Sequence, residues 1–190
     1  MTSLFPTDYE RPKTTQGGYL KFESGLNSIR VLSEIKTGWI YFNTENKPVR
    51  SKTMYESKPM DISEKGKVRH FWVMVVWNNT LKKVQILEIT QSTIMEALEA
   101  LFNNPKWGDF RKYDLAITKT GEELETKYTV QGEPPIADTA LEIVNQYTEM
   151  NINLEVIYTG GDPFTMQATP QATPQAPVDD NGLTVENIPF

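Results

Sequence analysis

Short runs of hydrophobic residues separated by polar turns dominate the first 131 residues and predict β-strands. The strongest run, at residues 68–78, is rich in β-branched and aromatic side chains. A turn signal at Asn78-Asn79-Thr80 and another run at residues 83–89 predict that these two strands form a hairpin. Weaker runs at residues 19–23, 27–33 and 35–43 predict one long coiled first strand, and runs at residues 113–119 and 124–131 predict the last two strands. Gly38 predicts a bend within its strand.

Between these strands the pattern predicts two helices and one long loop. A helical period begins near Ser92, with Ile94, Leu98 and Leu101 on one face, and ends before Asn104-Pro105. A second helix is expected at residues 138–150. Residues 44–67 are polar, hold six basic side chains and are expected to form a loop, which at this length is usually functional or disordered.

The order of elements predicts a mainly β fold with flanking helices (β+α). About five strands with a helix between strands 3 and 4 match a barrel of the oligonucleotide-binding (OB) type. We expect a flexible arm at residues 1–16, an OB domain with a C-terminal helix at residues 17–160, and a disordered acidic tail at residues 161–190. The repeated Ala-Thr-Pro-Gln unit in residues 168–177 is typical of a linker.

Charge is divided unevenly along the chain. All 19 Lys and Arg residues lie between Arg11 and Lys127, and residues 1–127 hold 16 acidic residues, which leaves this part at +3. Residues 128–190 hold the other nine acidic residues and carry −9, so the whole chain is at −6. Such asymmetry indicates either nucleic-acid contact by a basic body with an acidic interaction tail, or a chance gradient in an acidic protein.

The sequence offers no credible active site. There is no Cys, and the single His, His70, lies inside an apolar strand, so the usual zinc patterns are excluded. Neither Gly17-Gly18 nor Gly160-Gly161 has the spacing of a phosphate-binding loop. We expect no catalysis, no metal and no cofactor. The first residues lack a signal-peptide core and no run reaches membrane-span length, so we expect a soluble intracellular protein without a membrane partner.

Aromatic and basic side chains interleave throughout the basic body, as single-strand binding requires. Cations follow the phosphates, while flat rings stack on bases. The candidate DNA contacts are Arg30, Lys36, Trp39, Tyr41, Arg50, Lys52, Arg69, Phe71, Trp77, Lys83, Trp107, Arg111, Lys112 and Lys127. Strand alternation places His70 and Trp72 on one face and Phe71 and Trp77 on the other; one set is core, and the sequence leaves open which.

The last residues combine acidic side chains with a terminal aromatic ring. A partner could bury the Phe190 ring in an apolar pocket and meet its carboxylate with a basic residue. The candidate partner-binding tip is Asp179, Asp180, Glu186, Ile188, Pro189 and Phe190. The tail is also expected to compete with DNA for the basic body, because −9 faces +3 within one molecule.

Two stretches of the chain resemble known single-stranded DNA-binding proteins. The end, Val185-Glu186-Asn187-Ile188-Pro189-Phe190, is similar to the Asp-Asp-Asp-Ile-Pro-Phe tip of the bacterial proteins, with a thinned acidic run. The body resembles the proteins of tailed bacteriophages in Asn27-Ser28-Ile29-Arg30-Val31-Leu32-Ser33, His70-Phe71-Trp72, Val84-Gln85-Ile86-Leu87-Glu88-Ile89-Thr90-Gln91 and Asn104-Pro105-Lys106-Trp107-Gly108-Asp109.

The resemblance implies an OB fold and sequence-tolerant binding of single-stranded DNA during phage replication, recombination and repair in the cytoplasm of an infected bacterial host. It also implies replication or recombination proteins as partners of the tip. The alternative is an OB-like interaction or recombination-mediator module with little DNA affinity. If Arg30, Lys52, Lys83, Arg111 and Lys127 share one groove, DNA binding is favoured; if they are dispersed, the module is favoured. A homodimer and the choice between DNA and RNA stay open.

Overall fold

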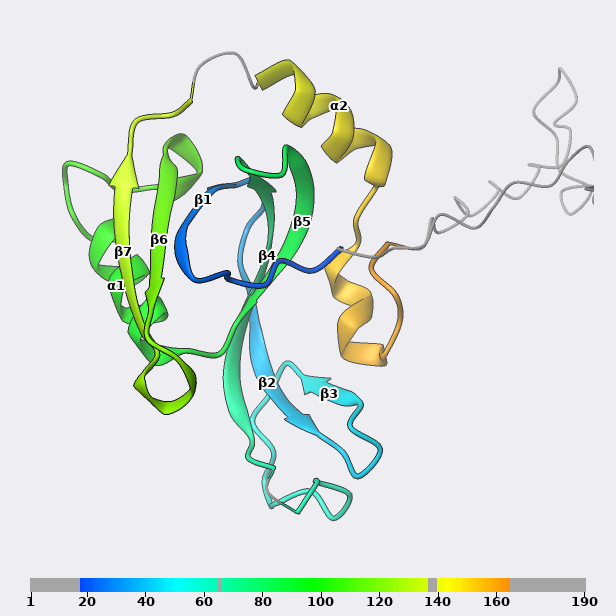
Figure 1. Ribbon diagram of the computed structural model, residues 1–190. Helices are drawn as coiled ribbons and strands as arrows, with labels where there is room; N and C mark the ends of the chain where they lie inside the picture. Colours follow the sequence, from blue (N-terminus) through cyan, green and yellow to red (C-terminus); the bar gives the residue numbers. More distant parts are fainter. Residues whose placement is uncertain (1–17, 65, 137–139, 165–190) are drawn as a thin grey trace, which may run out of the picture.

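The computed structural model describes residues 18–64, 66–136 and 140–164, and its main feature is one antiparallel sheet (Figure 1). The sheet contains seven strands in the order β3-β2-β4-β1-β6-β7, with β5 also paired to β4. The strands are β1 (Gly25–Val31), β2 (Lys36–Phe42), β3 (Pro48–Ser51), β4 (Arg69–Asn78), β5 (Lys83–Ile89), β6 (Asp114–Thr120) and β7 (Lys127–Glu133). The predicted mainly β architecture is therefore confirmed.

Strand β4 is the centre of the sheet because it has partners on both edges. One edge pairs first with β2 and then with β1, while the other edge pairs with β5 in the expected hairpin. Between β1 and β2 the chain stays close to β4, since Leu32 N donates to Val75 O at 2.9 Å. The bend in the first long strand thus falls at residues 32–35, between β1 and β2, and the prediction of a bend at Gly38 is wrong.

Gly38 serves close packing inside β2. A Cβ atom there would lie 2.3 Å from the Ser51 carbonyl oxygen of β3 and 2.9 Å from the Phe71 ring. Only glycine permits this approach of the two strands.

Three further expectations are corrected by the structure. The region around Tyr19 makes only an isolated bridge to Ile86, so residues 19–23 are not a strand. Strand β3 lies inside the expected long loop, because Asn43 Oδ1 accepts from Glu45 N and Lys47 N and closes a tight turn before it. Residues Glu123–Glu125 form a 3₁₀ turn rather than the start of β7.

Helices cover the two faces of the sheet on opposite sides of β4 (Figure 1). Helix α1 (Ser92–Phe102) buries Ile94, Met95 and Leu98 in a first core cluster with residues of β1, β4, β5 and β6. Helix α2 (Ala140–Met150) and the 3₁₀ helix η3 (Leu154–Thr159) cover a second cluster on the other face. Both expected helices are thus confirmed over the described residues, and residues 137–139 lie outside them.

The sheet is open between β5 and β7. Among the described residues β7 pairs only with β6, and no pairing joins it to β5. The expected arm at residues 1–16, residues 165–190 of the expected tail and the tip lie outside the described residues. Within the described part, neither α1 nor α2 has the length and apolar character needed to cross a bilayer.

Candidate nucleic-acid interface

Three aromatic rings lie on one face of the sheet where β2 pairs with the beginning of β4. Trp39 is opposite His70 and Thr37 is opposite Trp72, so Trp39, His70 and Trp72 share that face; we call them the ring row. The Trp39 and His70 ring centroids are 5.2 Å apart at 55°, and Trp72 Nε1 donates to His70 Nε2 at 3.2 Å. All three residues are half-buried.

His70 has one nitrogen without a partner. Because Nε2 accepts the hydrogen bond from Trp72, a neutral imidazole carries its proton on Nδ1. That atom is buried and has no hydrogen-bond partner among the described residues.

The ring row continues into the loop between β3 and β4. Tyr41, two residues after Trp39 on β2, packs against Tyr55 at 5.3 Å, and its hydroxyl donates to Asp61 Oδ1 at 2.8 Å. Burial, and then the Asp61 carboxylate, raise the pKa of Tyr41 to about 12. A cavity of about 640 Å³ in this loop is lined by Tyr55 together with Lys58 and Lys67. Cations therefore lie at one end of the ring row.

Five predicted DNA-contacting cations are held in ion pairs. Arg30 Nε lies 2.7 Å from the Oδ1 atom of Asp114, which is buried, and Arg50 Nε lies 2.8 Å from Glu88 Oε2. The other three are Lys36 and Lys52, both paired with Glu155, and Arg111, paired with Asp109. The Arg111 hydrogen bonds hold the pKa of Asp109 below its usual value.

The other four predicted cations have no ion pair among the described residues and lie far apart in the sheet. Arg69 begins β4, Lys83 begins β5, Lys112 is in the 3₁₀ helix η1 (Phe110–Lys112), and Lys127 begins β7. A shared groove of five cations was expected to distinguish DNA binding from an interaction module: Arg30, Lys52, Lys83, Arg111 and Lys127. Arg111 and Lys83 line different cavities, and the other three line neither of these. Those five therefore do not form one groove.

Three of the five predicted stacking rings are unavailable, so those assignments are corrected. Phe71 and Trp77 have 0% of their surface exposed, because α2 and η3 cover that face of β4. Tyr41 is 5% exposed and is closed in by Tyr55. Trp39 stays at the surface in the ring row, while Trp107 is 37% exposed and packs over Gly132 of β7 and against Tyr113.

Sequence reasoning missed His70, Trp72 and Tyr55 as members of the interface. Alternation placed His70 and Trp72 on one face, and the register confirms this. The further expectation that only one of the two faces is core was wrong. Both faces of β4 are core along most of the strand, and only the end near Arg69 has half-exposed rings. The pairing of Trp39 with His70 was the missing information, and it needs the strand register.

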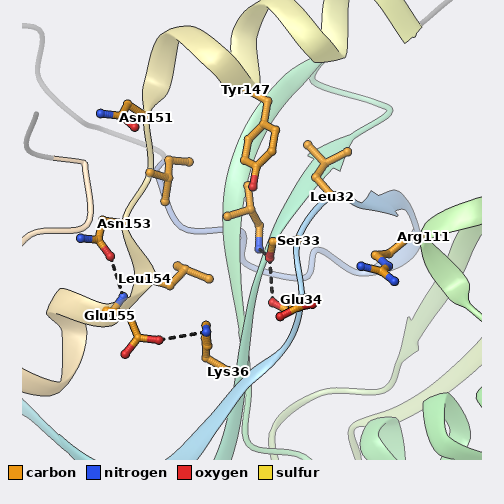
Figure 2. Close-up of a pocket in the computed structure, with 12 residues that line it drawn as sticks. Leu32, Ser33, Glu34, Lys36, Arg111, Tyr147, Asn151, Asn153, Leu154 and Glu155 are labelled. Carbon is orange, nitrogen blue, oxygen red and sulfur yellow. Dashed lines mark hydrogen bonds and ion pairs between the residues drawn. The ribbon is translucent and has the colours of Figure 1, made fainter.

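A second cavity lies on the opposite face, between the β1–β2 connection and the C-terminal helices. It measures about 600 Å³ (Figure 2). Lys36 and Glu155 are joined at one side of it, and Arg111 lies at the other side. Hydrogen bonds from Lys52 and then Lys36 lower the pKa of Glu155 to about 2, so this carboxylate is ionised at neutral pH.

Comparison of the chain with protein-family models, with curated proteins and with solved structures finds no match. Within the described residues, no group of three or more His, Asp and Glu side chains is placed to hold a metal ion. The ring row is thus the feature that defines the candidate site.

Proposed function

We propose that the protein binds single-stranded DNA with little sequence preference, and that the ring row receives unpaired bases. Stacking of a base on an aromatic ring is worth roughly 1–3 kcal/mol and tolerates any sequence, because every base has a flat face. The observation that carries the proposal is the grouping of Trp39, His70 and Trp72 on one half-exposed face.

Cations near this face would hold the phosphates of the strand. Lys58 and Lys67 line the loop cavity beside Tyr55, which packs against Tyr41 of β2, and neither lysine has an ion pair among the described residues. These two lysines take the place of the dispersed arginines and lysines predicted from the sequence.

In this proposal the sheet is an OB-type barrel left open between β5 and β7, and no reaction is catalysed. The protein would coat single strands during phage replication, recombination and repair in the host cytoplasm. The tip at Ile188, Pro189 and Phe190 would recruit replication or recombination proteins. The resemblance described above supports these assignments, and α1 lies between the third and fourth strands predicted from the sequence.

Replacement of Trp39 tests the proposal directly. Binding of an oligo-dT strand to the full chain can be followed by quenching of tryptophan fluorescence at two salt concentrations. Trp39→Ala is expected to weaken binding by about 5- to 100-fold, the equivalent of one lost stack. Wild-type affinity should fall with salt at a slope of about −0.7 per phosphate contact.

Leu81→Ala is the matched control. Leu81 is 54% exposed in the β4–β5 turn and is not in the ring row, so its removal should leave affinity within about twofold. Equal losses in the two variants would remove the ring row from the site. Absence of any fluorescence change with oligo-dT at low salt would reject DNA binding altogether.

A second candidate, an interaction module with little DNA affinity, is favoured by one observation. The five cations Arg30, Lys52, Lys83, Arg111 and Lys127 do not share a groove, and three of them are held by carboxylates. The same titration separates the two candidates, because the module predicts no saturable, salt-dependent binding of oligo-dT.

A further inference from the structure

Glu155 of η3 joins two lysines, one at the start of β2 and one in the residue that follows β3. Its Oε1 lies 2.9 Å from Lys36 Nζ at the start of β2, and its Oε2 lies 2.7 Å from Lys52 Nζ just after β3. Asn153 caps η3 by accepting from Glu155 N at 3.0 Å. We call this arrangement the Glu155 bridge.

Tyr158 fixes η3 on the sheet beside the bridge. Its hydroxyl donates to the Thr37 carbonyl oxygen at 2.8 Å, and its ring centroid lies 5.1 Å from Lys52 Nζ. Lys36 and Lys52 are therefore held at a defined spacing by the two strands, and η3 supplies the anion between them.

One carboxylate oxygen on each ammonium is the arrangement that a phosphate group of a nucleic-acid strand would adopt on the same two lysines. All three side chains are reachable from solvent, with exposed fractions of 39% for Lys36, 64% for Lys52 and 46% for Glu155. The cavity of about 600 Å³ adjoins Lys36 and Glu155 (Figure 2). An incoming anion therefore has both space and access.

The bridge lies next to the ring row along the chain. Lys52 directly follows Ser51, which is paired with Trp39, and Lys36 directly precedes Thr37, which is paired with Trp72. The two lysines lie on the face of the sheet opposite to the ring row. Strand β3 pairs with β2 from Trp39 onward, and at Thr37 the same edge of β2 contacts Tyr158 of η3 instead. A DNA strand that passes from the ring row around this edge of β2 would therefore come to the Glu155 bridge.

We propose that Lys36 and Lys52 form a phosphate-binding site for the DNA strand, and that Glu155 occupies it until a phosphate displaces it. The inference rests on the proposed function. A phosphodiester carries one negative charge, as Glu155 does, so the exchange leaves the net charge at the two ammonium groups unchanged. Glu155 acts as a competitor built into the fold, and it sets how tightly the strand is held at this point.

Glu155→Gln in the full chain removes the competing charge and keeps the shape of the side chain. Titrated with oligo-dT, this variant is expected to bind about 3- to 10-fold more tightly than wild type, the range given by release of two exposed ion pairs. Adding Lys36→Met and Lys52→Met to Glu155→Gln should cancel the gain. When Glu155 is present, it competes for both lysines, so the same two replacements should change affinity much less than they do in the Glu155→Gln background.

Glu45→Gln is the matched control for the change in charge. Glu45 pairs with Lys47 at 2.7 Å in the neighbouring β2–β3 turn, and its removal should alter affinity by less than about twofold. Glu155→Asp is a second variant that keeps the charge but is too short to span both lysines, so an intermediate gain is expected. Circular dichroism confirms that each variant is folded.

The outcomes separate this inference from the proposed function. If wild type binds oligo-dT but Glu155→Gln gains no more than Glu45→Gln, the phosphate site is rejected and the binding function stands. If the gain survives loss of both lysines, it comes from general charge and the site is likewise rejected. If wild type binds no oligo-dT, the function and the site fail together.

Discussion

The two ends of β4 both carry aromatic residues but have different environments. At the C-terminal end, Met74 to Trp77 are buried, and partners lie on both edges, β1 on one and β5 on the other. At the N-terminal end, Arg69 to Phe71 pair with β2 alone among the described residues, and His70 is half-exposed. Trp77 fills a core at one end, whereas at the other end the Phe71 ring is buried and the His70 ring on the opposite face is half-exposed.

This difference shows that neighbours, rather than residue type, decide what a ring does. Trp77 and Trp72 lie in the same strand, but α2 and η3 cover the face that carries Trp77, whereas the face of Trp72 is only partly covered. An aromatic run in a sequence therefore marks a strand reliably and a binding surface poorly.

The largest effect that tests this comparison is on stability. Trp77→Ala is expected to lower the free energy of unfolding by about 3–5 kcal/mol, because a fully buried ring is replaced by a cavity. His70→Ala at the other end should cost only about 1 kcal/mol, the value of the hydrogen bond from Trp72. Urea unfolding followed by circular dichroism gives both values, and a reversed order would show that the two ends are wrongly distinguished.

Two arginines predicted as DNA contacts sharpen the same comparison. Arg30 is opposite Trp77 and pairs with Asp114, whose side chain is 1% exposed. Arg30→Met leaves that carboxylate buried without its cation and should cost about 3 kcal/mol of stability. Arg69→Met, at the exposed end of β4, should stay within about 0.5 kcal/mol. Thermal melts of the two variants measure the difference, and equal melting temperatures would contradict a structural role for Arg30.

The smallest expected effect concerns Tyr41 beside the ring row. Its pKa is raised from 10.0 in the unfolded chain to about 12 in the fold. The neutral form is therefore favoured by folding, and this contribution to stability is complete below pH 10 and is lost as the pH rises towards 12. Burial also raises the pKa of Tyr19, Tyr55, Tyr113 and Tyr158, so absorbance at 295 nm should show several late-ionising tyrosines, of which the one near pH 12 disappears in Tyr41→Phe. Ionisation of that tyrosine near pH 10 would mean that the loop does not close over Tyr41.

Much of the fold follows from local patterns in the sequence. The β4–β5 hairpin was predictable because a β-branched run, a turn at Asn78 and a second run lie in direct succession. Helix α1 was predictable from its 3.6-residue period. Strand β3 was not, because it is four residues long and depends on a turn closed by the Asn43 side chain, which no hydrophobic period records.

The site was less predictable than the fold, since it depends on pairings between distant residues. Trp39 was among the candidate DNA contacts and is half-buried, but its partner His70 is fixed only by the register of β2 on β4. The prediction that the listed cations are available to DNA failed for several of them because their carboxylate partners lie far away in sequence. Asp114 is such a partner for Arg30, and Glu155 is one for Lys36. Charge counts show how many cations exist and not which of them are already neutralised.

Strand β4 also forms a wall shared by both core clusters, with Met74 and Val76 facing one and Val73 and Val75 facing the other. If one core cluster unfolded by itself, it would expose the strand that supports the other cluster, so unfolding should be a single cooperative event. Backbone amides of β4 between Val73 and Trp77 should accordingly exchange with deuterium only through global opening, later than those of β3 or β7 at the margins.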